Sequence, residues 1–166
     1  MARSIATIGV YCYDADTFLD TLRRAEVSLL LDVRQRRGVR GPRFAWANSL
    51  RLQAMLAEAG IGYEHHPDLA PTTELRHLQY REDDRLGVGK RSRQVLAPGY
   101  VRGYVEEILD RAALEPVVEG LPSVGSAALF CVECDGAACH RSLVAQRLAD
   151  RFGLSVRHLT PDPARG

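Results

Sequence analysis

Short apolar runs alternate with amphipathic segments along the whole chain. Between the first two runs, Phe18, Leu19 and Leu22 recur at helical spacing behind the capping candidates Asp14 and Asp16. Similar helical patterns cover residues 52–59, 101–112 and 144–152. The strand-like runs cover residues 5–10, 27–32, 61–64, 127–132 and 155–159. Strands that alternate with helices predict a three-layer α/β fold, with a mainly parallel sheet of about five strands and helices on both faces.

The length of 166 residues suits one domain over residues 1–166, which can bury roughly 70% of its unfolded surface without a metal or disulfide. Residues 69–97 are harder to assign, because they are rich in charge and lack a clear period. Within them we expect a helix from Thr73 to Tyr80, followed by a mobile basic loop that contains the sequence GVGKRSR.

The four cysteines are expected to be thiols. The N-terminal residues lack the apolar core of a signal peptide, and no apolar stretch approaches the roughly 20 residues that span a bilayer. A cytoplasmic location without a membrane partner is therefore expected. In that reducing compartment disulfides are rare, so the expectation applies to Cys12, Cys131, Cys134 and Cys139.

Cationic charge is concentrated in one segment, although the net charge is only +1. Arginines occupy positions 34, 36, 37, 40 and 43, and guanidinium groups suit phosphate or carboxylate contacts. The segment Arg34 to Arg43 is therefore a candidate for binding an anionic small molecule or nucleic acid. The alternative is a general preference for arginine, since Lys90 is the only lysine.

In open parallel sheets, ligands bind outside the carboxyl ends of the strands. We therefore expect residues 9–13, 32–34, 63–66 and 133–141 to face one crevice. The last group holds the main candidates. Cys139 is expected at or just before the first turn of a helix, where the helix dipole favours a thiolate. Glu133 and His140 would handle protons, and Arg141 would hold an anion; alternatively, the three residues from Cys139 to Arg141 serve packing, capping and ion pairing.

Neighbouring strands supply further candidates. Asp32 can orient a hydroxyl or a cationic side chain, and Arg34 and Arg36 can bind phosphate, unless Asp32 and Arg34 form only a structural ion pair. Tyr63 is a candidate binding residue. His65 is a candidate general acid or base, although loop histidines often simply face solvent.

The spacing C-x2-C-x4-C-H raises the question of zinc. We expect no metal site, because the side chain of Cys131 should point into the core from its strand. Adjacent ligands such as Cys139 and His140 are also awkward to aim at one ion. Ligation of a metal or haem by the Cys139 thiolate stays open as an alternative.

Several motifs, taken in order, resemble the domain-of-unknown-function 488 family. They are TIG, LLLDVR, AGIGYEHHPDL, LFCVE and CHRSLVA, and the resemblance runs from Ser4 to Leu159. It implies the α/β fold and a site at the carboxyl edge of the sheet, but no activity. The turn after DVR and the segment Leu69-Ala70-Pro71 depart from the family pattern, and Cys134 is peculiar to this chain. The positions that match are Gly9, Asp32, Arg34, Phe44, Tyr63, Leu69, Glu133, Cys139, His140 and Arg141.

Our leading hypothesis is an enzyme that acts on a phosphate-bearing small molecule or nucleotide, with Cys139 as nucleophile or redox centre. A non-catalytic module that binds nucleic acid or another anion is the first alternative, and a metal- or haem-binding protein is the second. The sequence identifies no substrate, cofactor or oligomeric state.

Overall fold

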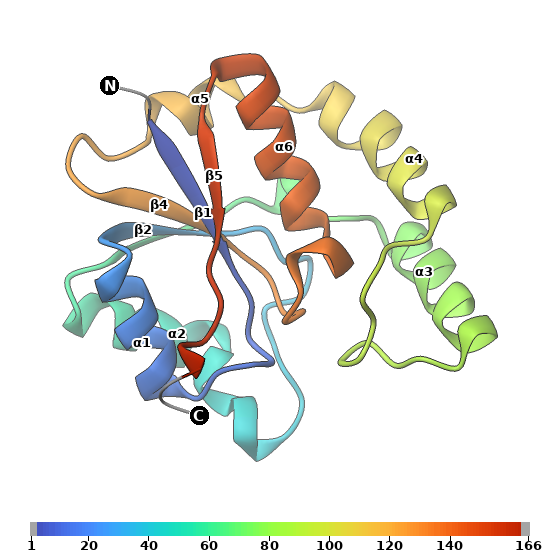
Figure 1. Ribbon diagram of the computed structural model, residues 1–166, viewed down its shortest axis with the longest axis horizontal. Helices are drawn as coiled ribbons and strands as arrows, with labels where there is room; N and C mark the ends of the chain where they lie inside the picture. The colour runs from blue at the N-terminus through green and yellow to red at the C-terminus, as the bar shows by residue number, and fades with distance from the viewer. Residues whose placement is uncertain (1–2, 164–166) are drawn as a thin grey trace.

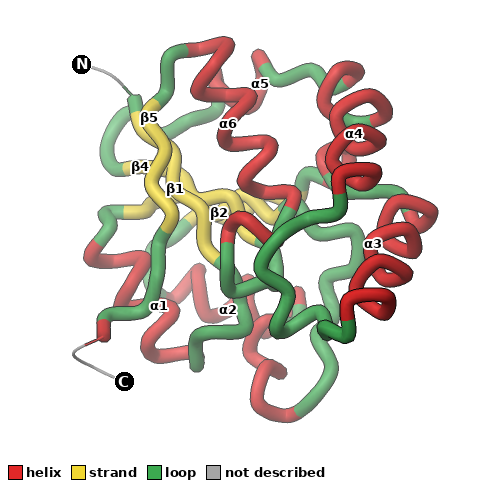
Figure 2. The backbone as a smooth tube through the Cα atoms, turned by 45° about the vertical axis from the view of Figure 1, so that its right-hand side comes forward, coloured by secondary structure: helices red, strands yellow, loops and turns green. Residues whose placement is uncertain are grey.

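The computed structural model describes residues 3–163 and contains one sheet of five parallel strands. The order is β3-β2-β4-β1-β5, so β4 lies between β1 and β2 at the centre. Figure 2 shows the sheet running through the molecule with helices on both sides, which confirms the expected fold. The strands are β1 (Ser4–Ile8), β2 (Val27–Asp32), β3 (Gly62–His65), β4 (Ser126–Phe130) and β5 (Ser155–His158).

Helices form the two outer layers. One face is covered by α1 (Ala15–Arg24) and α2 (Ser49–Glu58), and the other by α6 (His140–Phe152), which packs on β1, β4 and β5 (Figure 1). The Asp14 side chain caps α1 by accepting a hydrogen bond from the Thr17 amide, as the sequence suggests. Beyond α6 lie α4 (Pro98–Glu107) and α3 (Thr73–Leu86), with the short α5 (Glu115–Glu119) following α4.

Three helices differ from expectation. The helix expected over residues 101–112 is α4, which ends at Glu107 and is followed by a 3-10 turn over Leu109–Arg111. The third helix continues to Leu86 rather than ending at Tyr80, and Gly87 ends it with a φ of 71°. The sequence understates this helix because two of its three buried side chains, Gln79 and Asp83, are polar. Within residues 69–97, the irregular backbone therefore comprises residues 70–72 and 87–97, and α5 was not anticipated.

The connectivity creates a crevice at the carboxyl edge of the sheet. From β1 the chain crosses through α1 to β2, whereas from β4 it crosses through α6 on the opposite face to β5. The helices that follow β1 and β4 therefore lie on opposite faces of the sheet although the two strands are neighbours, which is the arrangement at which α/β proteins bind ligands.

Two of the four expected thiols are joined in a disulfide. Cys12, after β1, is bonded to Cys134, after β4, across a sequence separation of 122 residues. The expectation of thiols at these positions was wrong: it was based on a reducing compartment, whereas pairing of β1 with β4 brings the two loops close enough for a disulfide. Cys131 and Cys139 are buried and unbridged. Among residues 3–163, no helix combines the length and apolar character needed to cross a membrane.

Candidate functional site

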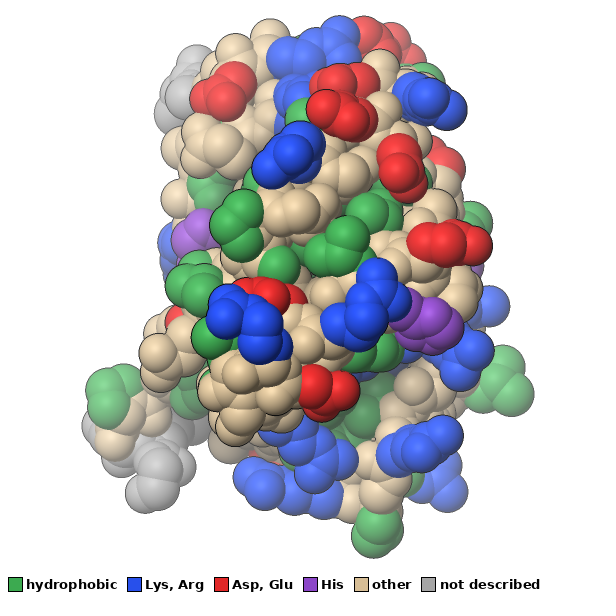
Figure 3. All heavy atoms as spheres, turned by 90° about the vertical axis from the view of Figure 1, so that its right-hand side faces the viewer, with side chains coloured by type: hydrophobic (Ala, Val, Ile, Leu, Met, Phe, Trp, Pro, Cys, Tyr) green, Lys and Arg blue, Asp and Glu red, His purple; other side chains and the backbone are tan. Residues whose placement is uncertain are grey.

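A pocket of about 470 Å³ lies at the carboxyl edge of the sheet. Loops after β1, β2 and β4 supply one side, and α3, α4 and the segment between them supply the other. On the face that α3 and α4 present, Lys and Arg side chains are prominent over the lower part of the view (Figure 3). Seven cationic residues line the pocket, namely Arg34, Arg36, Arg40, Arg76, Lys90, Arg91 and Arg93.

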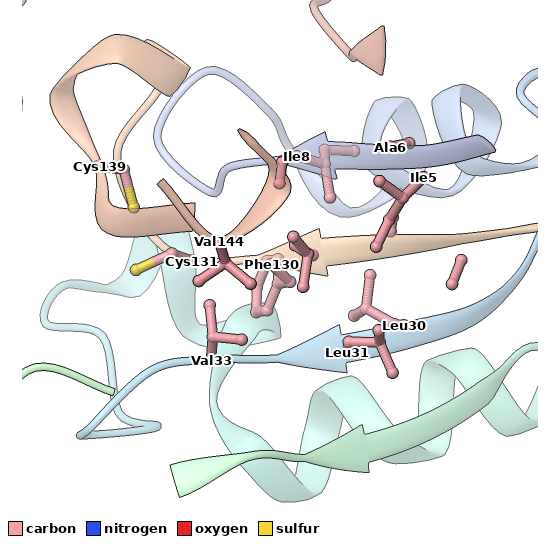
Figure 4. Packing of buried hydrophobic residues seen from close by; sticks show 14 of the residues in the cluster. Ile5, Ala6, Ile8, Leu30, Leu31, Val33, Phe130, Cys131, Cys139 and Val144 are labelled. Atoms are coloured by element: carbon pink, nitrogen blue, oxygen red, sulfur yellow. The ribbon is translucent and has the colours of Figure 1, made fainter. Parts of the chain in front are cut away.

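Two sulfur atoms and an imidazole form part of the pocket lining. The Nδ1 atom of His140 lies 3.7 Å from the Sγ of Cys139 and 3.9 Å from the Sγ of Cys131. Cys131, Cys139 and His140 are each at most 5% exposed, and all three line the pocket. Figure 4 shows both sulfur atoms beyond the ends of the strands. These three side chains could hold a metal ion, because their ligand atoms lie within 4.8 Å of one another.

Local backbone geometry explains how adjacent residues reach one point. Cys139 is the N-cap of α6 and has extended backbone (φ −138°, ψ 146°), whereas His140 is the first helical residue. The expected position of Cys139 is confirmed. Cys131 is buried in the core, as expected, but β4 ends at Phe130, and the Cys131 sulfur also lies beside His140.

The other ring nitrogen of His140 is held by the backbone. Its Nε2 lies 2.8 Å from the carbonyl oxygen of Val33, the residue after β2. A carbonyl oxygen can only accept, so Nε2 carries a proton and donates it. In the neutral ring, Nδ1 then presents its lone pair to the two sulfur atoms.

The two thiols differ in acidity. Burial raises the pKa of Cys139, but the hydrogen bond from Cys131 and the positive charges of His140 and Arg141 outweigh it, so the net pKa is well below the ordinary value. The pKa of Cys131 is well above its ordinary value, because its hydrogen bond to Cys139 and its burial both favour the protonated thiol. Burial lowers the pKa of His140, but the charge of Cys139, the hydrogen bonds to Cys139 and Val33 and the charge of Glu133 together raise it overall.

Glu133 brings a buried carboxyl group to the same pocket. Burial and the negative charge of Cys139 raise its pKa to about 7, against the opposing effect of Lys90 and Arg93. Its Oε1 accepts a 2.8 Å hydrogen bond from Arg93, whereas Oε2 is buried and has no partner within the described part of the chain. One carboxylate oxygen is therefore fixed and the other is unused.

Sequence reasoning missed Arg93 and its neighbours in the segment expected to be a mobile loop. Arg93 is buried and donates to both Asp83 and Glu133 at 2.8–2.9 Å, which anchors residues 87–97 over the pocket. Burial lowers the pKa of Lys90, but the charge of Glu133 together with those of Tyr11, Tyr80 and Cys131 raises it overall. The buried polar positions Gln79 and Asp83, four residues apart on α3, are the signal that could have indicated a partner for them.

Asp32 and Arg34 form a buried ion pair. Arg34 donates from Nε and Nη2 to the two carboxylate oxygens of Asp32 at 2.9 and 2.8 Å, and from Nη1 to the Ala47 carbonyl. The hydroxyl of Tyr63 donates to Asp32 at 2.6 Å, and His65 contacts the Arg34 carbonyl at 3.0 Å. Of these predicted residues Arg34 reaches the pocket, while Asp32, Tyr63 and His65 lie behind its lining.

Arg141 supports the loop after β4. Its guanidinium is buried and donates to the carbonyl oxygens of Glu133 and Cys134 at 2.7 and 3.3 Å. It does not line the pocket, so its positive charge reaches Cys139 from behind.

The arginines of residues 34–43 point to different places. Arg36 and Arg40 are exposed and line the pocket, whereas Arg37 donates to Tyr63 and Arg43 stacks on Phe44. The segment therefore offers two cations to a pocket ligand rather than a continuous strip of five.

One family model, described as "Domain of unknown function DUF488", matches residues 14–148. The chain belongs to this family. No curated protein and no solved structure matches it. The match includes Cys131, Glu133, Cys139 and His140, which form the floor of the pocket, and Arg141, which supports the loop after β4.

Proposed function

We propose that this DUF488 protein is an enzyme that binds an anionic, phosphate-bearing small molecule in the pocket and acts on it at Cys139. The observation that carries the proposal is the composition of one cavity: cationic side chains line it together with the cluster of Cys131, Cys139 and His140. A cavity of about 470 Å³ is within the usual size range for small-molecule sites.

The charges favour an anion. Arg36 and Arg40 make no ion pair within residues 3–163, so their charges are available to a ligand that enters beside them. Arg91 stacks on Tyr11 and Phe44, which holds a third guanidinium near the entrance. Arginine binds phosphate and carboxylate groups with two parallel hydrogen bonds.

The residues on the floor of the pocket favour a catalytic role over binding alone. A purely structural core would use apolar side chains, yet this floor holds two thiols, an imidazole and a carboxylate with one unpartnered oxygen. Glu133 is the residue best placed to exchange a proton with a bound molecule, because it lines the pocket and Oε2 is unused.

Thermal unfolding in the presence of inorganic phosphate, sugar phosphates and nucleoside monophosphates tests the binding step. A ligand present at 100 times its Kd stabilises the fold by about 2.7 kcal/mol. The double variant Arg36→Gln/Arg40→Gln should lose most of this effect, whereas Arg102→Gln, an exposed residue of α4 outside the pocket, should retain it. Turnover of the stabilising molecule, followed by phosphorus NMR, should then vanish in Cys139→Ser.

Nucleic acid is the competing ligand, and the same variants separate it. If no small molecule stabilises the fold but an oligonucleotide binds with a steep salt dependence, the protein is a nucleic-acid-binding module instead. The split orientation of residues 34–43 argues against that outcome, because Arg34 is only 2% exposed and already paired with Asp32.

A further inference from the structure

We infer that Cys131, Cys139 and His140 form a binding site for a soft divalent cation, with Zn²⁺ the best match. This inference rests on the proposed function, since it names the group through which Cys139 would act on a molecule in the pocket. Each ligand atom comes from a different side chain on the pocket floor, and the three atoms lie within 4.8 Å of one another.

The distances suit a tetrahedral ion. With Zn–S near 2.3 Å and Zn–N near 2.1 Å, the edges of a tetrahedral site are about 3.6 Å between sulfur and nitrogen. The measured separations of His140 Nδ1 from the sulfurs of Cys139 and Cys131 are 3.7 and 3.9 Å. An ion can therefore be accommodated by small side-chain movements.

The imidazole is prepared as a ligand by its second contact. Histidines that bind metals usually donate the other ring N–H to a carbonyl or carboxylate, which fixes the tautomer and the ring orientation. His140 does this through Nε2 to Val33 at 2.8 Å. Val33 directly follows β2, the strand that pairs with β4, so the ring is held at the carboxyl edge of the sheet.

The ligand set also meets the charge requirement of a buried site. Two thiolates and a neutral imidazole balance the charge of a divalent ion, whereas two thiolates without a cation would be costly to bury. Catalytic zinc characteristically has three protein ligands and an open fourth position. Here all three ligands line the pocket, so the fourth position would face a bound anion or water.

Glu133 lies beside the ligand set rather than within it. Its carboxylate is not among the atoms that share the 4.8 Å cluster, and one oxygen is already bonded to Arg93. With an ion bound, the Glu133 carboxylate would be available to a water or substrate oxygen rather than to the ion.

Titration with Co²⁺ alone tests the site, in chelator-treated protein that keeps the Cys12–Cys134 disulfide and has Cys131 and Cys139 as thiols. We expect one ion per chain, thiolate-to-cobalt charge-transfer absorption and the visible bands of a tetrahedral cobalt site. Cys131→Ser and His140→Gln should each weaken Co²⁺ binding roughly 100-fold or more, because changes to outer partners alone cost about 10–100-fold. Cys12→Ser/Cys134→Ser is the matched control: it removes two cysteines outside the cluster and should keep the spectrum.

A measurement on the unaltered chain covers the case in which a variant fails to fold. Zn²⁺ should reduce iodoacetamide labelling of Cys131 and Cys139, mapped by mass spectrometry, relative to the chelator-treated chain. Absence of Co²⁺ binding, or an unchanged cobalt spectrum in folded Cys131→Ser, overturns the inference. Anion binding without Co²⁺ binding would leave the proposed function standing, whereas Co²⁺ binding without any anion would leave only the metal site.

Discussion

Arg93 donates a 2.8 Å hydrogen bond to Glu133 and thereby ties the segment after α3 to the loop after β4. The same guanidinium donates to Asp83 at 2.9 Å, and all three residues are at most 7% exposed. One arginine therefore balances two buried carboxylates at the edge of the pocket.

Arg93→Ala should lower the free energy of unfolding by about 3 kcal/mol, because it leaves two buried carboxylates without their shared cation. Urea unfolding at neutral pH measures this. Arg85→Ala is the matched control, since an ion pair that water screens, such as Arg85–Glu82, contributes little to stability. Equal losses in the two variants would show that Arg93 does not anchor the segment.

Asp32→Asn should also cost about 3 kcal/mol, because Arg34 would keep a buried charge without its counterion. Tyr63→Phe removes only one hydrogen bond to the same carboxylate and should cost about 1 kcal/mol. Denaturant unfolding of both variants measures the two losses in unfolding free energy, and their ratio shows which partner of Asp32 contributes more. A larger loss for Tyr63→Phe would mean that the tyrosine, rather than Arg34, stabilises Asp32.

Gly9→Ala should disrupt the site, because a Cβ at this position would lie 1.8 Å from the carbonyl oxygen of Glu133. The backbone must shift, and we expect a loss of about 3 kcal/mol in unfolding free energy together with weaker anion binding. Gly89→Ala is the control: its Cβ would approach only Ser92, at 3.9 Å, and should change stability by less than about 0.5 kcal/mol. An unperturbed Gly9→Ala protein would contradict the close approach of β1 and the loop after β4.

Reduction of Cys12–Cys134 should lower the free energy of unfolding by about 3 kcal/mol, since the bond closes a long loop in the unfolded chain. Alkylation after unfolding checks the pairing: Cys131 and Cys139 should be labelled without reductant, and all four cysteines with it. Labelling of all four cysteines without prior reduction would mean that the bond is absent from the purified protein.

His158 links stability to pH. Burial and the nearby Arg141 lower its pKa, and its Nδ1 lies 2.7 Å from the Thr7 hydroxyl. The neutral ring is favoured in the fold, so its contribution is complete above the ordinary value of 6.5 and is lost as the pH falls through the lowered pKa. The stability advantage of the wild type over His158→Gln should therefore shrink between about pH 7.5 and pH 5. A constant difference would count against this linkage.

Local pattern was sufficient for most of the fold. The strand Val27–Asp32 was predicted with its observed bounds, and the helix after Asp14 begins at its predicted cap. Both signals are carried by residues a few positions apart. The third helix was underestimated because its buried positions Gln79 and Asp83 are polar, and their burial depends on partners distant in sequence.

Some residues of the site could likewise be predicted from local sequence, and others could not. Sequence placed Cys139 at the start of a helix and Glu133 after a strand, because both positions follow from local periodicity and from the topology of parallel sheets. Arg93 and Lys90 were missed, since no local pattern records which loop folds over a pocket.

The cluster of Cys131, Cys139 and His140 depends on both local sequence and tertiary contacts. The amino-acid sequence alone shows that sulfur and imidazole groups occur together after a buried strand. The contact of Cys131 with His140, the orientation of the ring by Val33 and the bond between Cys12 and Cys134 arise only in the folded chain. These contacts depend on the order of strands in the sheet, because that order brings together loops far apart along the chain.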